Sequence, residues 1–445
     1  MKFYSIFFGK TKEFKNINQN DSIYLNFLYT LVVLLPVLLL TGPFLPDLVI
    51  VISSFSFIYI NFKYKIYLYF ENNIVKIFLL FWIYLIFSSL TSDNIFFSLK
   101  SSFFYIRFIL FSLFVLFLIK NYSSFLKFFF YSLTIALLII LIDSNFQFFF
   151  DKSLTGFEKP NLRLTGPFGD RQIVGSFISR ILPLYLFLYM YLYKKINYQF
   201  LSFILLLNVL ILFSGERTAF FASTFFFLGV YFLFSNKIKK FLFVIFFYIL
   251  TSSLLILITP SLNERIIVQT LQGFALKNFS KHNDEIKSYF EKKPNRGFYI
   301  FSRAHEVHYL TAIKMFQDSP IIGVGPNMFR KKCSEAKFYI EQSSCTTHPH
   351  NFLLQILAET GLVGAIFFIS ALIIILREII IKLYYKKIKK NSISINEIGK
   401  YILSFGFLIN VFIIFLPNGN FFNNYLNAVI FIPLGFYLFL IENDK

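Results

Sequence analysis

The feature that most constrains this chain is a series of long apolar segments that recurs from one end to the other. Each segment has about 17 to 25 residues, the length that an α-helix needs to cross the hydrocarbon core of a bilayer. Charged residues, prolines or glycines bound the segments. The sequence therefore predicts about twelve transmembrane helices, near residues 23–41, 44–62, 74–91, 101–119, 124–142, 173–192, 198–214, 218–235, 240–259, 351–376, 399–417 and 425–441.

The composition agrees with this prediction. Of the 445 residues, 57% are hydrophobic and 15% are charged, and the mean hydropathy is +0.66. Soluble domains carry roughly 25% charged residues. We therefore expect an all-α, polytopic integral membrane protein.

The formal net charge of +20 could indicate nucleic-acid binding, but the positions of the lysines favour another explanation. Lysine-rich connections alternate with connections that are almost free of lysine, such as 214–217 and 418–424. The positive-inside rule then predicts that both termini are cytoplasmic and that the lysines contact the bilayer, with no nucleic-acid partner. The lysines of the basic connections are Lys2, Lys10, Lys12, Lys15, Lys63, Lys65, Lys120, Lys194, Lys195, Lys237, Lys239, Lys240, Lys382, Lys386, Lys387, Lys389 and Lys390.

Two connections are long, and this topology places both on the outer side. They cover about 143–172 and about 260–349, and function often resides in such loops. We expect three parts: nine transmembrane helices in 1–259, a large outer loop of short helices in 260–349, and three transmembrane helices in 350–445. Cys333 and Cys345, the only cysteines, lie in the large loop as two thiols or, as we favour, a disulfide.

The large loop also contains a predicted amphipathic helix in the segment FSRAHEVHYLTAIKMF. Its apolar residues recur at helical spacing, which indicates a helix that lies on the membrane face or under a lid. His305 and His308 are one turn apart in this helix and resemble half of a metal site. Because no other ligand set completes the site, we expect a surface helix with two histidines and no bound metal. The apolar positions are Val307, Leu310, Ile313 and Phe316.

Four arginines on the outer side indicate an anionic substrate. Arg217 follows a short outer connection, where it either clamps phosphate oxygens or pairs with Glu216 or lipid headgroups. Arg303 opens the amphipathic helix, near a helix N-terminus that favours anions, although a solvated arginine is also consistent with that position. Arg163 lies in the first long connection, and Arg180 is about two turns into a predicted span, so it should face the protein interior or a wet cavity.

The segment HPHNFLLQILAETGLVG carries the most specific polar pattern. Asn351, Gln355 and Glu359 recur every four residues and so share one helix face, which must point away from lipid. His350 stands at the outer end of that face, next to His348, where an imidazole can act as a general base. The alternative is a histidine that caps a buried helix end, with Asn351 and Gln355 as contacts between helices.

Together with the preceding IIGVGPNMF and the long outer loop, this segment resembles the O-antigen ligase and O-antigen polymerase superfamily of bacterial membrane glycosyltransferases. The resemblance implies a GT-C-like helical fold in the bacterial inner membrane, with the active site facing the periplasm. It implies a glycan donor linked to undecaprenyl pyrophosphate and, for a ligase, the lipid A-core oligosaccharide as acceptor. It implies no cofactor.

The resemblance also implies roles for individual residues. His350 would be the general base, and Arg217 and Arg303 would bind the pyrophosphate. We expect further substrate contacts from Arg163, Arg180, His348, Asn351 and Gln355. A ligase is the favoured member, and the alternatives are an O-antigen or exopolysaccharide polymerase, a protein O-oligosaccharyltransferase and, in a different class, a lipid or glycan transporter.

Overall fold

The structure, a computed structural model, describes residues 19–65, 67–234, 238–273, 302–388, 394–413 and 416–442. Within these ranges the chain is helical, and its one β-bridge joins Lys152 to Glu158. The prediction of an all-α membrane protein is therefore confirmed. The N-terminal helices are α2 (Gln19–Leu38), α3 (Phe44–Tyr64), α4 (Asn73–Leu90), α5 (Ile95–Phe103), α6 (Ile106–Asn121), α7 (Phe125–Phe150) and α8 (Val174–Tyr193).

The remaining helices follow in chain order. They are α9 (Tyr198–Phe213), α10 (Arg217–Phe234), α11 (Ile238–Ile258), α12 (Pro260–Leu262), the π-helical η4 (Asn263–Val268), α13 (Gln269–Gly273), α15 (Arg303–Asp318), α16 (Phe329–Lys332), α17 (Phe352–Ile388), α18 (Ile395–Phe407) and α19 (Asn424–Glu442). The predicted division at 260 and 349 stays a prediction.

Each predicted span contains a helix, but the helices differ in length. Among the described residues, eight helices are long and apolar enough to cross a membrane, and a ninth is possible if the bent pair Leu242–Ile258 and Pro260–Leu271 is counted as one span. The helices of 198–213 and 217–232 are apolar but shorter. The chain is thus a multi-pass membrane protein, and the number twelve stays a prediction.

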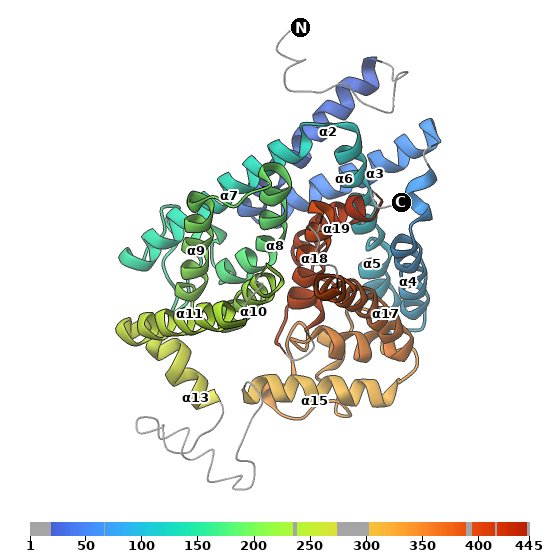
Figure 1. Cartoon of the computed structure of the whole chain (residues 1–445). Helices are drawn as coiled ribbons and strands as arrows, with labels where there is room; N and C mark the ends of the chain where they lie inside the picture. Colours follow the sequence, from blue (N-terminus) through green and yellow to red (C-terminus); the bar gives the residue numbers. More distant parts are fainter. Residues whose placement is uncertain are drawn as a thin grey trace.

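The core is built around α6, which is buried along almost its whole length and packs against α3 and α19. The hydroxyl of Ser112 donates to the carbonyl oxygen of Phe431 at 2.8 Å, where Gly435 lets the two backbones approach closely. Small residues at such contacts are typical of helix packing in membranes. A second pair, α8 and α18, packs beside this core, as Figure 1 shows.

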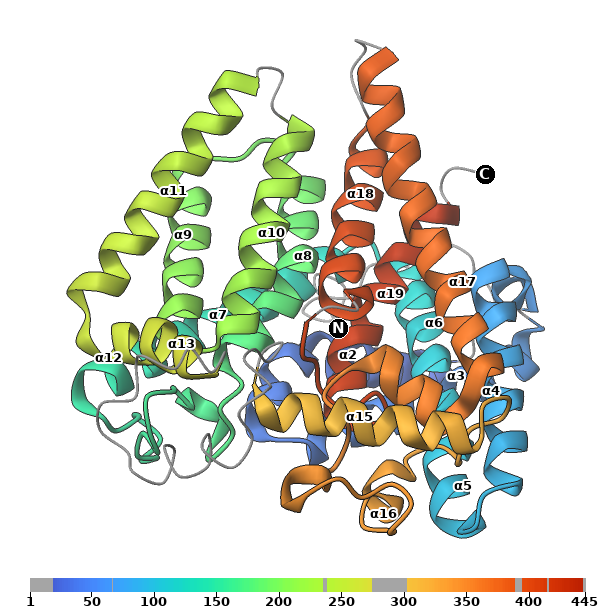
Figure 2. The same cartoon turned by 90° about the horizontal axis from the view of Figure 1, so that it is seen from below.

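The short helices that follow α11, together with α15, gather at one end of the molecule. Figure 2 shows α12, α13 and α15 in one layer, from which α10, α11, α17 and α18 extend away. A 102° bend at Pro260 turns the chain from α11 into this layer. The helix α15 packs across α17, so the start of α17 lies beneath it. This arrangement brings distant parts of the sequence together at the head of α17.

The predicted amphipathic helix exists as α15, and its predicted apolar face is only partly buried: Val307 is buried, and Leu310 and Phe316 are half-buried. Ile313 is 37% exposed, whereas His308 and Thr311 are buried together with Val307, Ala312 and Met315. The side of α15 that packs on α17 differs from its apolar stripe. A protein surface offers polar partners that lipid does not, so polar residues of α15 can be buried there. The expectation of a surface helix with two histidines is not met at His308, which is buried, whereas His305 is half-buried.

The segment 320–325 packs against residues 358–363 of α17. The N–H groups of Val324 and Gly325 donate to the carbonyl oxygens of Ala358 and Glu359, at 3.0 and 2.9 Å. Gly361, with φ +63°, breaks the helical backbone and lies against Ile321 so closely that a Cβ atom would overlap the Ile321 carbonyl. This contact, the glycine lock, holds the segment 320–325 onto α17.

Candidate functional site

The backbone places His350 just before the N-terminus of α17. Asn351 caps the helix, because its side-chain oxygen accepts from the N–H of Leu354 at 3.0 Å. His350, one residue earlier, has a left-handed backbone with φ +57°, and its carbonyl oxygen accepts from the N–H of Asn418 at 2.7 Å. A cap on one side and Asn418 on the other therefore fix the direction in which the chain presents this histidine.

Four histidines converge at this point, which we call the histidine cluster: His305, His308, His348 and His350. The ring centre of His350 lies 4.1 Å from that of His348, 5.4 Å from that of His305 and 5.3 Å from that of His308. Two of the rings come from α15 and two from the segment before α17. The structure therefore brings His348 and His350 together as expected, and adds two rings that sequence reasoning placed at a surface.

Burial makes these imidazoles poor bases by ordinary standards. It lowers the pKa of His350 to about 4, with further lowering by His305 and His308. Burial and the neighbouring His350 ring lower the pKa of His348 to about 3. For His305, burial, His308 and the guanidinium of Arg217 lower the pKa to about 4. The cluster is consequently neutral near pH 7, with ring nitrogens that can accept a proton.

Hydrogen bonds hold three of the four rings, and for His308 the bond is to the backbone of Ser343. His348 Nδ1 lies 2.8 Å from the hydroxyl of Thr347, and its Nε2 lies 3.3 Å from the carbonyl oxygen of Asn418, to which it can only donate. His305 Nδ1 lies 2.7 Å from the hydroxyl of Ser302. The ring of His350 has no hydrogen-bond partner among the described residues and is half-buried, so it is the ring left available to a ligand.

Three arginines gather beside the cluster around a single carboxylate. Arg163 lies 3.6 Å from Glu216 and donates to the carbonyl oxygen of Gln172 at 2.6 Å. Arg265 donates to the carbonyl oxygen of Gly215 at 3.2 Å. Arg217, at the start of α10, donates to the hydroxyl of Thr270 at 2.7 Å. Three guanidinium groups against one carboxylate leave a local excess of positive charge.

One interpretation of the sequence paired Glu216 with Arg217, but in the structure the carboxylate of Glu216 has other partners. Its carboxylate accepts from the N–H of Gly175 at 2.7 Å and from the hydroxyl of Ser176 at 2.5 Å, at the N-terminus of α8. Helix N-termini favour such anions. Among the described residues, Arg217 therefore has a neutral hydroxyl as its side-chain partner, and its charge remains available.

Arg180 is linked to the histidine cluster by hydrogen bonds through Asn418. It is half-buried in α8 and donates to the side-chain oxygen of Asn418 at 2.8 Å. Asn418 also bonds the backbone of His350 and the ring of His348. The expectation that Arg180 faces the protein interior is confirmed, and Asn418 couples its position to that of the two histidines.

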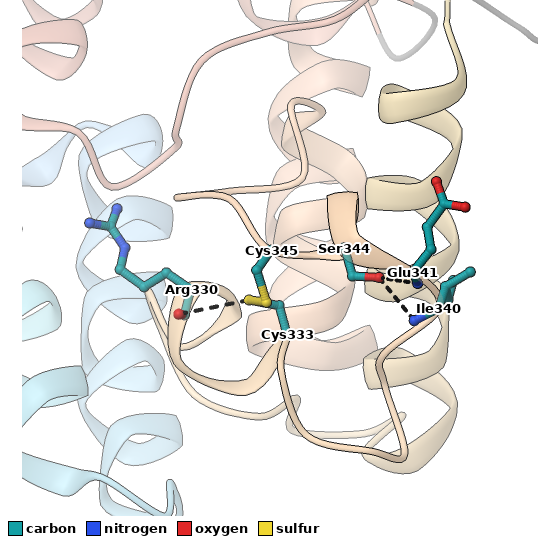
Figure 3. Close-up of a disulfide and its surroundings, with 6 residues drawn as sticks. All are labelled: Arg330, Cys333, Ile340, Glu341, Ser344 and Cys345. Atoms are coloured by element: carbon teal, nitrogen blue, oxygen red, sulfur yellow. Dashed lines mark hydrogen bonds between the residues drawn. A yellow bond between two sulfur atoms is a disulfide. The ribbon is translucent and has the colours of Figure 1, made fainter. Parts of the chain in front are cut away.

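Arg303 differs from the other arginines because its guanidinium group already forms a bidentate ion pair with a carboxylate. Its Nε donates to Glu341 at 2.8 Å, and its Nη2 pairs with the other carboxylate oxygen. The hydroxyl of Ser344 accepts from the N–H groups of Ile340 and Glu341, as Figure 3 shows. Cys345, the next residue, forms a disulfide with Cys333, so the favoured pairing of the cysteines is confirmed. The loop thus holds Glu341 against Arg303.

The polar stripe of α17 is buried, as predicted. Gln355 donates to Glu359 at 3.0 Å and to Asn420 at 2.8 Å, and its oxygen accepts from the N–H of Phe421 at 2.8 Å. Glu359 accepts from the N–H of Phe329 at 2.9 Å. Asn351 and Gln355 are therefore engaged with the protein itself, which corresponds to the structural alternative for these two residues. Whether they also contact substrate stays a prediction.

Sequence reasoning missed Asn418, Asn420 and Arg265. The two asparagines lie in the connection PNGNFFNN, whose polar run between two apolar segments was a usable signal. Arg265 follows Pro260 by one and a half turns, and like Arg217 it lies just beyond the end of an apolar segment. Within the described part of the chain, no three His, Cys, Asp or Glu side chains are arranged to hold a metal ion.

Comparison with protein families places these residues in a known context. The family model described as O-Antigen ligase matches residues 200–369. No curated protein matches the chain. The matched region runs from α9 into α17 and includes Arg217, Arg265 and the whole histidine cluster, whereas Arg163 and Arg180 precede it. The resemblance noted in the sequence is confirmed: the chain carries an O-antigen ligase family domain at residues 200–369.

Proposed function

We propose that the protein is an O-antigen ligase-type glycosyltransferase that moves a glycan from undecaprenyl pyrophosphate to the lipid A-core oligosaccharide. The observation that carries this proposal is the position of His350. Its ring has no hydrogen-bond partner among the described residues, and it lies beside His305, whose pKa is lowered by burial, by His308 and by the charge of Arg217. A base without a partner next to excess positive charge suits transfer from an anionic leaving group.

The arginines would bind the donor. Arg217 has only a hydroxyl partner among the described residues, so it can direct its charge to the pyrophosphate. Arg163 pairs with Glu216, and Arg265 interacts electrostatically with all three of these groups. As the bond between the sugar and the pyrophosphate breaks, its electron pair stays on the leaving oxygen. Stabilisation of that growing negative charge is usually the largest contribution that such a site makes.

His350 would act on the acceptor. Its neutral ring accepts the proton of the attacking hydroxyl as the new bond to the anomeric carbon forms. General base catalysis of this kind contributes about 10² to 10⁴ in rate. A single displacement inverts the anomeric centre, and the pyrophosphate linkage already provides the activation that the transfer needs.

Arg303 would join the site only after a change of partner. Its bidentate pair with Glu341 is half-buried, and a phosphate group offers the same fork-shaped geometry of oxygens as a carboxylate. We propose that the pyrophosphate replaces Glu341 on Arg303 when the donor binds. His348 and Arg180 would hold the base in place through Asn418 rather than contact the leaving group.

The proposal includes an orientation in the bacterial inner membrane. The lysine pattern supports cytoplasmic termini and a periplasmic site, with twelve spans if α9, α10, α18 and the bent pair around Pro260 are counted. A layer of short helices over one end of a helical bundle supports a GT-C-like arrangement. The three-part division at 260 and 349 belongs to the same proposal.

A lipopolysaccharide gel tests the function and its main alternative. The full-length protein is expressed in a host without its own ligase, and the lipopolysaccharide and the undecaprenyl-linked glycans are examined. A restored ladder of long chains on the core supports a ligase. In the producing bacterium, loss of the protein that leaves the core capped with a single repeat unit indicates a polymerase instead. An unchanged pattern in both cells contradicts both activities.

A further inference from the structure

A basic patch near the histidine cluster has no role in the proposed mechanism. It consists of Lys100 of α5 and of Arg330 and Lys331 of α16, and we call it the α5–α16 patch. All three side chains are exposed. Within the described ranges, none of their charged groups has a hydrogen bond or an ion pair, and Lys331 lies over the ring of Phe97, 5.1 Å from its centre. Three cations without an anionic partner offer a binding surface for an anion.

The two lysines of the patch come together because α5 packs against the segment that leads into α16. The side-chain amide of Asn327 donates to the hydroxyl of Ser101 at 3.0 Å. Lys100 follows Phe97 by one helical turn, and residues three apart are neighbours on a helix surface. Since Lys331 lies over the ring of Phe97, it also lies near Lys100. Figure 2 shows α5 and α16 at the same end of the molecule as α15.

Exposed aromatic side chains border the patch. Phe96 is 88% exposed and Phe103 is 52% exposed, whereas Ser98 and Ser102 of the same helix are buried. The helix α5 therefore turns its polar face to the protein and its aromatic residues outward. Exposed aromatic residues next to lysines are typical of helices that lie in the membrane interface. In that position the lysines are at the level of the lipid headgroups.

The patch is close to the histidine cluster but apart from Arg217, the proposed ligand of the donor. Burial and the His350 ring lower the pKa of His348, and the charge of Arg330 lowers it further. Figure 3 shows the guanidinium group of Arg330 pointing away from the disulfide. In Figures 1 and 2, α10, which carries Arg217, lies toward the start of α15, and α5 lies toward its end. A lipid bound at α5 would therefore approach the histidines from a different side than the donor.

We propose that the α5–α16 patch binds the phosphate groups of lipid A, the membrane anchor of the proposed acceptor. Lipid A is a phosphorylated glycolipid, so its phosphates match the three cations and its acyl chains match the exposed aromatic residues of α5. The core oligosaccharide would extend from the patch toward His350. This assignment rests on the proposed function, because it takes lipid A-core oligosaccharide as the acceptor.

Binding of lipid A to the full-length protein in detergent tests the patch without any transfer. The probes are lipid A, dephosphorylated lipid A and phosphatidylglycerol, and native mass spectrometry measures the bound fraction. We expect the Kd for lipid A to rise about tenfold when Arg330→Gln and Lys331→Gln are combined. Lys152→Gln, the same change at an exposed lysine of another connection, is the control and should keep the parental Kd. If dephosphorylated lipid A or phosphatidylglycerol binds as tightly as lipid A, the proposal is overturned.

Transfer kinetics separate this site from the proposed function. In the double variant we expect KM for the acceptor to rise about tenfold, with kcat and the donor KM unchanged. A parental acceptor KM would overturn the patch as a lipid A site and leave glycan transfer established. A protein that binds lipid A through the patch but transfers no glycan to the core would instead refute the proposed function and leave the site standing.

Discussion

The two ends of the segment His348–Gly364 differ in how their polar groups are satisfied. At the end that contains Glu359 and Gly361, carboxylate and backbone are bonded to the 320–329 segment. At the other end, the ring of His350 has no partner in the described structure although three imidazoles surround it. In the proposed function, one short sequence pattern thus combines a structural half with a reactive half, and substitutions in the two halves should fail in different ways.

The largest effect on transfer is expected at the reactive end. His350→Ala removes the base, so transfer should fall by about 10² to 10⁴ while the melting temperature stays within a few degrees of the parent. Initial rates of glycan transfer and thermal unfolding in detergent measure the two quantities. Leu362→Ala, an exposed position near the other end, is the control and should change neither. A variant that is inactive because it no longer folds would contradict this assignment.

Arg217 and Arg303 offer the next sharpest comparison. Arg217→Ala should raise the donor KM about 10- to 100-fold, because a charged hydrogen bond of roughly 1.5–3 kcal/mol is lost. Arg303→Ala should have a smaller effect, because Glu341 competes with the donor for this side chain in the parent. Glu341→Gln should therefore lower the donor KM. An unchanged KM in Glu341→Gln would show that Arg303 is purely structural.

At the structural end, Gly361→Ala should act through folding. The left-handed φ of +63° and the overlap of a new Cβ with the carbonyl of Ile321 both oppose alanine at this position. A backbone penalty of about 1–3 kcal/mol predicts a lower melting temperature and less folded protein. The protein that does fold should keep the parental donor KM, so a changed KM with unchanged stability would break the distinction between the two halves.

Much of this division was visible in the sequence. The spacing of Asn351, Gln355 and Glu359 predicts one buried face of a helix, and the structure confirms that face. The position of His350 just before that helix also followed from the pattern. The glycine lock did not, because periodicity along one helix contains no information about which distant loop packs against it.

Other parts of the site depend on contacts that local spacing cannot reveal. Apolar periodicity predicted only part of the buried face of α15, because it identifies the side that avoids water and here the buried side also includes His308 and Thr311. Arg303 was expected to bind pyrophosphate or to be solvated. Its pairing with Glu341 could not be predicted, because the two residues are 38 apart in sequence and only the folded loop brings them together. Long-range pairing of this kind is a tertiary property.

The pH dependence of the melting temperature tests the burial of the histidines at the reactive end. His348 and His350 have pKa values of about 3 and about 4 in the folded protein, against about 6.5 in an unfolded chain. The unfolded state therefore binds more protons, so the histidine contribution to stability is complete above pH 6.5 and declines as the pH falls toward 4. Melting temperatures at pH 7.5 and pH 5 should differ less in His348→Gln than in the parent. An equal difference in both would contradict the assigned burial.

The smallest effect is expected from the disulfide. Cys333 and Cys345 are 12 residues apart, and removing such a link costs about 2–3 kcal/mol in the chain-entropy model. Because the link holds the loop that carries Glu341, Cys333→Ser with Cys345→Ser should lower the melting temperature and reduce transfer only a few-fold. Reduction of the parent with a thiol should give the same result, whereas complete loss of transfer would place the loop in the reactive half.

The most direct test of the central claim separates donor binding from transfer in His350→Ala. Purified full-length protein in nanodiscs is loaded with a fluorescent undecaprenyl-pyrophosphate glycan, and binding and single-turnover transfer are measured on the same sample. The account predicts that His350→Ala binds the donor as tightly as the parent and transfers at least about 100-fold more slowly. Transfer at the parental rate, or loss of donor binding together with transfer, would contradict a general-base role for His350.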